Sequence, residues 1–221
     1  MDNVKAVIFD FDNTLGDRYL YSYHTYRFFL KTFVPQVDEN SLLFESMVQD
    51  LILFDEYGNV AHKKQILDAF EERYGIRIEV DNFGKWWVEH QYLFTVLFPD
   101  TMDTVKKLKE KYKIACLTNG AHIAQWGKLE RSGLLPYMDA VIVSQDVGVS
   151  KPDPRIFQMM ADELGLKCEE CVYVGDTFSN DIVGAINAGM IPVWIWPSNK
   201  VRPSEYPVTR INNISDLLEI L

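Results

Sequence analysis

Short runs of consecutive apolar residues alternate with longer segments of helical periodicity over most of the chain. Five runs are typical of buried parallel strands, at residues 4–9, 113–118, 139–144, 171–175 and 192–196. Strands of a parallel sheet are covered on both faces, so they lack the regular polar positions of a half-exposed strand. The pattern therefore predicts an α/β fold with a Rossmann-like, doubly wound parallel sheet.

The segments between the later runs carry apolar residues at helical spacing. They predict helices at 100–112, 121–132, 154–164 and 179–188. Gly165 and Gly189 directly follow the last two segments, where glycine commonly ends a helix. The end of the chain, 208–221, predicts a short additional strand and a terminal helix.

The alternation is interrupted between the first and second runs. Four helical patterns rich in aromatic residues follow one another there, at 20–34, 40–54, 62–74 and 82–95. A crossover between parallel strands needs only one helix, so this segment is too long for a connection. We predict that residues 17–95 form an inserted α-helical cap subdomain, and that 1–16 and 96–221 form the Rossmann-like core.

Polar residues follow the expected strands at the points where those strands end. They are Asp10, Asp12 and Thr14 after the first, Thr118 and Asn119 after the second, Lys151 beyond the third, and Asp176 and Asp181 after the fourth. The carboxyl ends of parallel strands meet at one edge of the sheet, where ligands bind. Several carboxylates at that edge would repel one another unless a hard cation such as Mg²⁺ binds between them. A cation site beside a lysine and a hydroxyl is typical of phosphoryl transfer.

These residues stand in four motifs that occur in a fixed order. The motifs are "DFDNT" (10–14), "LTNG" (117–120), "SKPDP" (150–154) and "GDTFSND" (175–181). In this order and at strand ends they resemble the motifs of the haloacid dehalogenase-like (HAD) hydrolase superfamily, and the resemblance extends over the core. Asn13 stands where many relatives carry glycine. Because Asn tolerates left-handed backbone, we expect the turn to be kept.

The resemblance implies a role for each motif residue. Asp10 would be the nucleophile that forms an aspartyl phosphate, and Asp12 the general acid that later acts as base. The phosphoryl group would be bound by Thr118, Asn119 and Lys151. Mg²⁺ would be held by Asp10, Asp176, Asp181 and the backbone carbonyl of Asp12, and Asp181 would either be a direct ligand or lie behind the ligands. The second acid, Asp12, favours phosphate esters over carbon–halogen bonds, since a leaving halide needs no proton.

The resemblance implies a Mg²⁺-dependent phosphatase for a small soluble phosphate monoester, for example a nucleoside monophosphate or a sugar phosphate. A phosphomutase, a phosphonate-cleaving enzyme with a cap lysine, and a phosphate sensor without catalysis remain alternatives. Candidate specificity residues follow the first motif directly: Asp17, Arg18, Tyr19, Tyr23 and His24. A hinge with ordinary packing of the first cap helix explains the same residues equally well.

Composition narrows the possible partners and location. The 221 residues carry a net charge of −10 and a sequence pI near 4.9, which argues against a nucleic acid polymer as partner. The chain has no apolar run of the roughly 18 residues that span a bilayer, so we expect no membrane association. Three cysteines make a disulfide framework improbable and favour the cytoplasm. Monomer and homodimer both remain open.

Overall fold

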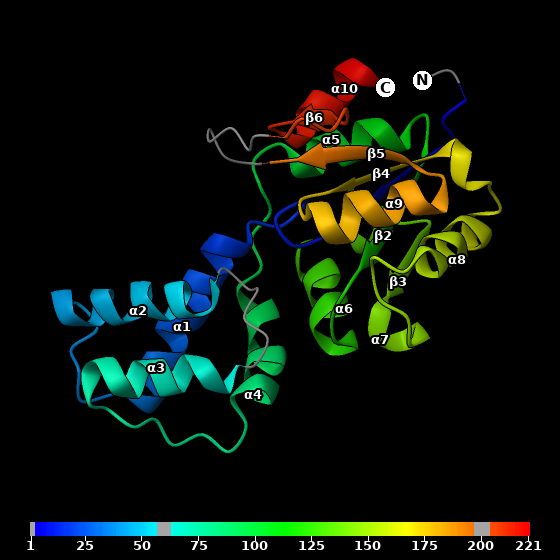
Figure 1. The fold of residues 1–221 in the computed structure, drawn as a ribbon. Helices are drawn as coiled ribbons and strands as arrows, with labels where there is room; N and C mark the ends of the chain where they lie inside the picture. Colours follow the sequence, from blue (N-terminus) through cyan, green and yellow to red (C-terminus); the bar gives the residue numbers. More distant parts are fainter. Residues whose placement is uncertain (1–2, 57–62, 197–203) are drawn as a thin grey trace. The chain divides into compact units, whose positions relative to one another are not determined.

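The computed structural model describes residues 3–56, 63–196 and 204–221. Its chain divides into two compact units, which Figure 1 draws as a sheet with its helices and a separate group of helices. The first unit, the core, comprises Met1–Asp17 and Leu97–Leu221, and the second, the cap, comprises Arg18–Val96. Both divisions fall one residue after the boundaries expected from the sequence.

The core contains a six-stranded parallel sheet in the order β3-β2-β1-β4-β5-β6. The strands are β1 (Ala6–Phe9), β2 (Lys113–Thr118), β3 (Ala140–Val143), β4 (Cys171–Gly175), β5 (Ile191–Ile195) and β6 (Thr209–Ile211). The strand β1 lies inside the sheet, with Ala6 in register with Lys113 on one side and with Cys171 on the other. This arrangement confirms the predicted doubly wound α/β fold.

Successive residues of β1 point to opposite faces of the sheet and enter two separate apolar cores. Val7 and Phe9 belong to one core, whereas Ala6 and Ile8 belong to the other. The first core is covered by α5 (Thr101–Lys109), α6 (His122–Arg131) and α10 (Leu217–Ile220), and the second by α8 (Pro154–Leu164) and α9 (Val183–Ala188). Figure 1 shows α9 running alongside β4 and β5 on its face of the sheet.

Two core helices differ from the sequence prediction. The segment expected to be helical from residue 179 starts as a π-helical turn, Phe178–Ile182, and the α-helix α9 begins only at Val183. A short helix, α7 (Ser144–Val147), follows β3 directly. Four residues are too few to produce a recognisable helical period, so α7 could not be predicted from the sequence.

The cap consists of α1 (Arg18–Phe33), α2 (Leu42–Phe54), α3 (Lys64–Tyr74) and α4 (Phe83–His90), followed by a 3₁₀ turn (Gln91–Phe94). Aromatic side chains fill its interior, where Tyr26 and Trp87 lie with ring centroids 4.6 Å apart and Phe29 and Phe83 lie 4.7 Å apart. The aromatic run near residue 83 therefore packs the cap core, as its helical spacing indicates. Among the described helices, none has the length and apolar character needed to cross a bilayer.

Candidate active site

The loop after β1 places two carboxylates at the edge of the sheet. Asp10 follows β1 directly, and its amide donates to the carbonyl of Val174 at 2.9 Å, which extends the pairing with β4. The carbonyl of Phe11 accepts bonds from the amides of residues 14, 15 and 16, so the loop folds back on itself. Asn13 adopts the expected left-handed conformation there, with a φ of 57°.

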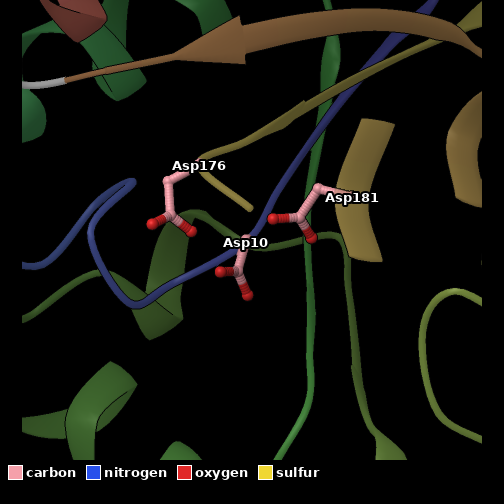
Figure 2. Close-up of side chains that lie close together, drawn as sticks. All are labelled: Asp10, Asp176 and Asp181. Carbon is pink, nitrogen blue, oxygen red and sulfur yellow. The ribbon is translucent and has the colours of Figure 1, made fainter. Parts of the chain in front are cut away.

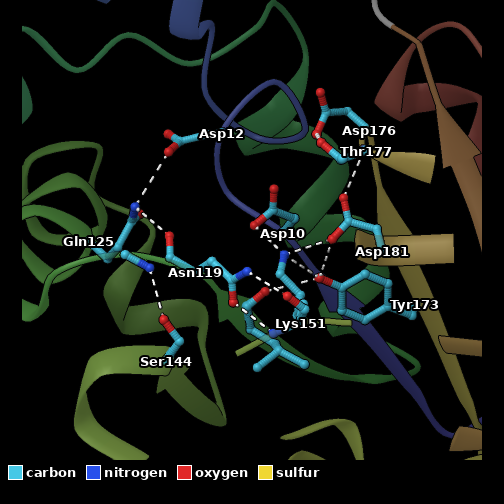
Figure 3. Close-up of polar contacts among 12 residues, drawn as sticks. Asp10, Asp12, Asn119, Gln125, Ser144, Lys151, Tyr173, Asp176, Thr177 and Asp181 are labelled. Atoms are coloured by element: carbon cyan, nitrogen blue, oxygen red, sulfur yellow. Dashed lines mark hydrogen bonds and ion pairs between the residues drawn. The ribbon is translucent and has the colours of Figure 1, made fainter. Parts of the chain in front are cut away.

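Lys151 occupies the centre of a buried polar cluster (Figure 3). Its Nζ lies 2.8 Å from Oδ1 of Asp10, 2.7 Å from Oδ1 of Asp181 and 2.9 Å from the hydroxyl of Tyr173. Burial alone would lower the pKa of Lys151, but the charges of Asp10 and Asp181 outweigh it and raise the pKa above its ordinary value. Lys151 is therefore a permanent cation in a site that water barely reaches.

Three buried carboxylates lie together at this edge: Asp10, Asp176 and Asp181 (Figure 2). Each offers an oxygen, and the three oxygens all lie within 4.8 Å of one another. Burial raises the pKa of Asp10 to about 6 against the opposing charge of Lys151, and the charge of Asp181 adds to the rise. Burial also raises the pKa of Asp176 to about 7, with contributions from the charges of Asp181 and Asp10.

The donor set fits a hard divalent cation. All three groups are carboxylates, which Mg²⁺ prefers. The raised pKa values of Asp10 and Asp176 mean that the site disfavours its own negative charge. A cation bound among these oxygens would remove that penalty.

Asp181 uses both of its oxygens within the protein. Oδ1 contacts Lys151, and Oδ2 accepts the amide of Thr177 at 2.9 Å. Its own amide donates to the carbonyl of Thr177 at 2.7 Å, inside the π-helical turn. The unusual start of this helix thus holds the Asp181 carboxylate against Lys151.

Asn119 fixes the backbone of Lys151 with its side-chain amide. Its Nδ2 donates to the Lys151 carbonyl at 3.0 Å, and its Oδ1 accepts the Lys151 amide at 2.9 Å. Thr118 ends β2 beside it and is buried, while the next amide, of Gly120, donates to Oγ of Ser144 at 3.0 Å. The second and third motifs are therefore joined by hydrogen bonds. This structural role of the Asn119 side chain was not predicted from the sequence.

The carboxylate of Asp12 belongs to a different set of contacts from the other acids. Both of its oxygens lie 2.8 Å from Nζ of Lys128, and Nε2 of Gln125 lies 3.4 Å from Oδ2. Lys128, Gln125 and Tyr173 were all missed as site residues from the sequence. A signal existed for the first two, because they are spaced by three on α6 and share its buried face with Ala124 and Leu129.

The candidate specificity residues Arg18, Tyr19, Tyr23 and His24 all lie on α1, in the cap. The hydroxyl of Tyr23 donates to Oε2 of Glu45 at 2.9 Å within that unit, whereas His24 and Tyr19 are exposed. Asp17 is the last residue of the core unit. Contact of these residues with a substrate stays a prediction.

Comparison with known proteins shows similarity over most of the chain. A family model described as haloacid dehalogenase-like hydrolase matches residues 4–189. A glyceraldehyde 3-phosphate phosphatase from Methanothermobacter thermautotrophicus is 33% identical, over 99% of this chain and 100% of the relative. The enzyme of the same name from Methanopyrus kandleri is 34% identical, over 87% of this chain and 84% of the relative.

A solved structure extends the similarity to the fold. The magnesium-bound HAD-hydrolase YfnB from Bacillus subtilis aligns with a TM-score of 0.77 at 22% identity, over 99% of this chain and 98% of that one. At this identity the likeness concerns the fold, and it spans nearly the full length of both chains.

Proposed function

The chain belongs to the family of haloacid dehalogenase-like hydrolases, and on this premise we propose that it is a Mg²⁺-dependent phosphatase acting through a phosphorylated Asp10. The single observation that carries the proposal is the position of Lys151, buried between Asp10 and Asp181 with Asp176 beside them. A fixed cation next to a cluster of buried carboxylates suits the transfer of a phosphoryl group.

The first step forms a bond between a carboxylate oxygen of Asp10 and phosphorus. Lys151 holds Oδ1 of Asp10 at 2.8 Å, which leaves the second oxygen of the carboxylate to attack phosphorus. The bond from phosphorus to the ester oxygen breaks, and the carboxyl group of Asp12 gives its proton to the departing oxygen. The products of this step are an alcohol, the acyl phosphate on Asp10, and the carboxylate form of Asp12.

The second step returns the enzyme to its starting state. The Asp12 carboxylate takes a proton from water, whose oxygen attacks phosphorus and releases Asp10. Inorganic phosphate leaves, and Asp12 has regained its proton. In both steps Lys151 and the Thr118 hydroxyl bind phosphoryl oxygens, and Asn119 keeps Lys151 in place.

The residues that would hold Mg²⁺ are Asp10, Asp176 and the carbonyl of Asp12, with Asp181 behind them. When bound, the ion supplies positive charge to the phosphoryl oxygens as negative charge develops on them. Asp181 has both oxygens engaged with Lys151 and Thr177, which supports an orienting role for it.

The substrate is a small phosphate monoester, and glyceraldehyde 3-phosphate is the first compound to test. The support comes from the names of the two relatives that match most of this chain. Nucleoside monophosphates and sugar phosphates, which the sequence also suggested, belong in the same panel. A phosphomutase would transfer the phosphoryl group to a second sugar phosphate instead of water.

The test is phosphate release from this panel by the purified protein, with Mg²⁺, with a chelator, and with the variant Asp10→Asn. We expect release that requires Mg²⁺ and that falls by about 1000-fold or more in Asp10→Asn. The matched control is Asp103→Asn, which alters an exposed aspartate in the first turn of α5 and should leave the rate unchanged.

Two results would contradict the proposal. One is undiminished release by Asp10→Asn, which would place the nucleophile elsewhere. The other is no release from any ester by a folded protein, with isomerisation of an added sugar phosphate indicating the mutase instead.

A further inference from the structure

Lys128 lies in the interior of the core, next to the acid that the proposed reaction uses to move protons. It belongs to α6 and has 0% of its surface exposed. Its Nζ is 2.8 Å from both oxygens of Asp12 and 5.8 Å from the ring centroid of Phe11. A side chain so buried cannot touch a substrate in this conformation, so any effect on the reaction must pass through a neighbour.

Burying an ammonium group at this position is energetically unfavourable. Its neighbours on the buried face of α6 include Ala124 and Leu129, and an apolar residue at 128 would complete that face. Removing an ammonium group from water is unfavourable, and apolar replacements of buried ion pairs are often as stable as the pairs themselves. Stability alone therefore does not account for a lysine here.

The geometry of the contact restrains the Asp12 side chain. A single nitrogen that bonds both oxygens holds the carboxylate symmetrically and restricts its rotation about the Cβ–Cγ bond. Gln125 adds a restraint one helical turn earlier, because its Nε2 lies 3.4 Å from Oδ2 of Asp12 and 3.2 Å from the carbonyl of Asn119. Asp12 is thus tied to the second motif through α6, as Figure 3 shows for Gln125.

We propose that Lys128 is a positioning residue that aims the Asp12 carboxyl group at the departing ester oxygen. This role rests on the phosphatase reaction proposed above. Proton transfer requires donor and acceptor at hydrogen-bond distance, and an acid that swings freely meets the ester oxygen only part of the time. Because Nζ of Lys128 contacts both oxygens of Asp12, the lone pairs that point away from Nζ are the ones left to carry the proton.

A positioning role can be distinguished from a merely structural one by comparing two substrates, one whose leaving group must be protonated and one whose leaving group need not be. Acetyl phosphate releases acetate, a stable anion, whereas an alkyl phosphate releases an alkoxide that must be protonated. The ratio kcat/KM covers the steps up to departure of the leaving group and omits the later hydrolysis of the aspartyl phosphate. We would measure it for acetyl phosphate and for the alkyl phosphate that the wild type hydrolyses fastest.

The variants are Lys128→Met, Lys128→Arg and the control Arg131→Met, which changes an exposed cation in the last turn of the same helix. For Lys128→Met we expect kcat/KM to fall about 100-fold with the alkyl phosphate and less than about 5-fold with acetyl phosphate. Lys128→Arg should recover part of the alkyl phosphate rate, and Arg131→Met should match the wild type.

An equal loss with both substrates would overturn the positioning role and leave Lys128 as a structural residue. An unchanged alkyl phosphate rate in Lys128→Met would overturn it as well. Neither result touches the proposed phosphatase function, which would fail only if the wild type released no phosphate or Asp10→Asn remained active.

A readout independent of activity tests the contact itself. In chelator, Asp12→Asn should lower the urea midpoint of unfolding because it removes the negative charge that lies 2.8 Å from the buried ammonium of Lys128. Adding Lys128→Met to that variant should raise the midpoint again. Additive midpoint shifts for the two changes would show that the residues do not interact and would overturn the inference.

Discussion

Gly175 leaves almost no space between β4 and the acid that contacts Lys151. A Cβ atom at this position would lie 2.4 Å from Cγ and 2.5 Å from Cβ of Asp181. The Cβ of Asp181 is fixed by the backbone of the π-helical turn, so it cannot rotate away as the end of a long side chain could. Any side chain at 175 must therefore displace the Asp181 carboxylate.

Gly175→Ala should consequently damage catalysis much more than folding. We expect kcat to fall about 100-fold, since a shift of about 1 Å in a positioned group has that effect. The measurement is phosphate release with saturating Mg²⁺, together with urea unfolding. Gly84→Ala is the matched control, because its Cβ meets nothing closer than 3.4 Å. Full activity in Gly175→Ala would mean that Asp181 tolerates displacement.

Among individual residues, the acids of the site could be predicted from the sequence, but Lys128, the cation that contacts Asp12, was missed. Asp10, Asp176 and Asp181 follow strands, and the ends of parallel strands meet at a known edge, so their proximity was predictable. Lys128 lies on a helix, where a lysine is ordinarily a solvated surface residue. Its spacing from Ala124 and Leu129 on α6 was a sequence signal of burial, and the packing of α6 against the loop after β1 identifies Asp12 as its partner.

At the amino-terminal end of the sheet, the carboxylate of Asp139 connects three secondary-structure elements, β2, β3 and α5. The amide of Ile114 in β2 donates to Oδ2 of Asp139 at 2.7 Å, and Nζ of Lys109 from the end of α5 lies 2.5 Å from the same oxygen. Asp139 immediately precedes β3, and its own amide donates to the carbonyl of Ile114 at 2.7 Å. Asp139 thus fixes the register between β2 and β3.

Stability should depend on pH through this residue. Partial burial opposes ionisation, but the bonds from Lys109 and the Ile114 amide outweigh it and lower the Asp139 pKa below 3.8. A lowered pKa stabilises the folded state above the unfolded value, and that stability is lost as pH falls through the folded value.

Asp139→Asn should therefore lower the free energy of unfolding at pH 7 by about 1 kcal/mol, a modest figure because a third of the side chain is exposed. The difference between variant and wild type should begin to shrink as pH falls below the unfolded value of about 3.9, and it should continue to shrink as pH falls through the lower folded value. Urea unfolding at pH 7, pH 5 and pH 3 measures this course. A difference as large at pH 3 as at pH 7 would mean that charge is not its origin.

The bounds of a helix or strand could be predicted where its apolar residues follow a regular pattern. β2 and β4 begin and end where their apolar runs do, because both are interior strands in which every residue except Lys113 is buried. The start of α9 was misplaced because the π-helical turn before it serves Asp181 and follows no apolar period. Local propensity thus failed where the backbone is shaped by the site.

In the molecule as a whole, the chain leaves and re-enters the core at adjacent points. Gly16 and Leu97 pair as an antiparallel bridge, and the amide of Phe98 donates to the carbonyl of Leu15 at 3.1 Å. The core and the cap have separate apolar interiors. The cap is therefore an insertion whose two ends the core itself brings together.

Replacing residues 18–95 with about four Gly and Ser residues should leave a core that folds. We expect cooperative urea unfolding and the blue-shifted fluorescence of Trp194, which is buried and donates to the carbonyl of Asp176 at 2.8 Å. A control in which 18–100 are replaced also loses the bond from the Phe98 amide to Leu15 and should be less stable. Failure of the shorter deletion to fold would show that the cap is needed for the core.

The interior position of β1 also determines the order in which the protein can assemble during synthesis. β1 leaves the ribosome before both of its neighbours in the sheet, which begin at Lys113 and Cys171. The buried cluster of the cap, by contrast, lies wholly between Tyr26 and Trp87. We therefore expect the cap to pack on the nascent chain while β1 is still unpaired, so that β1 is translated before the cap but enclosed after it.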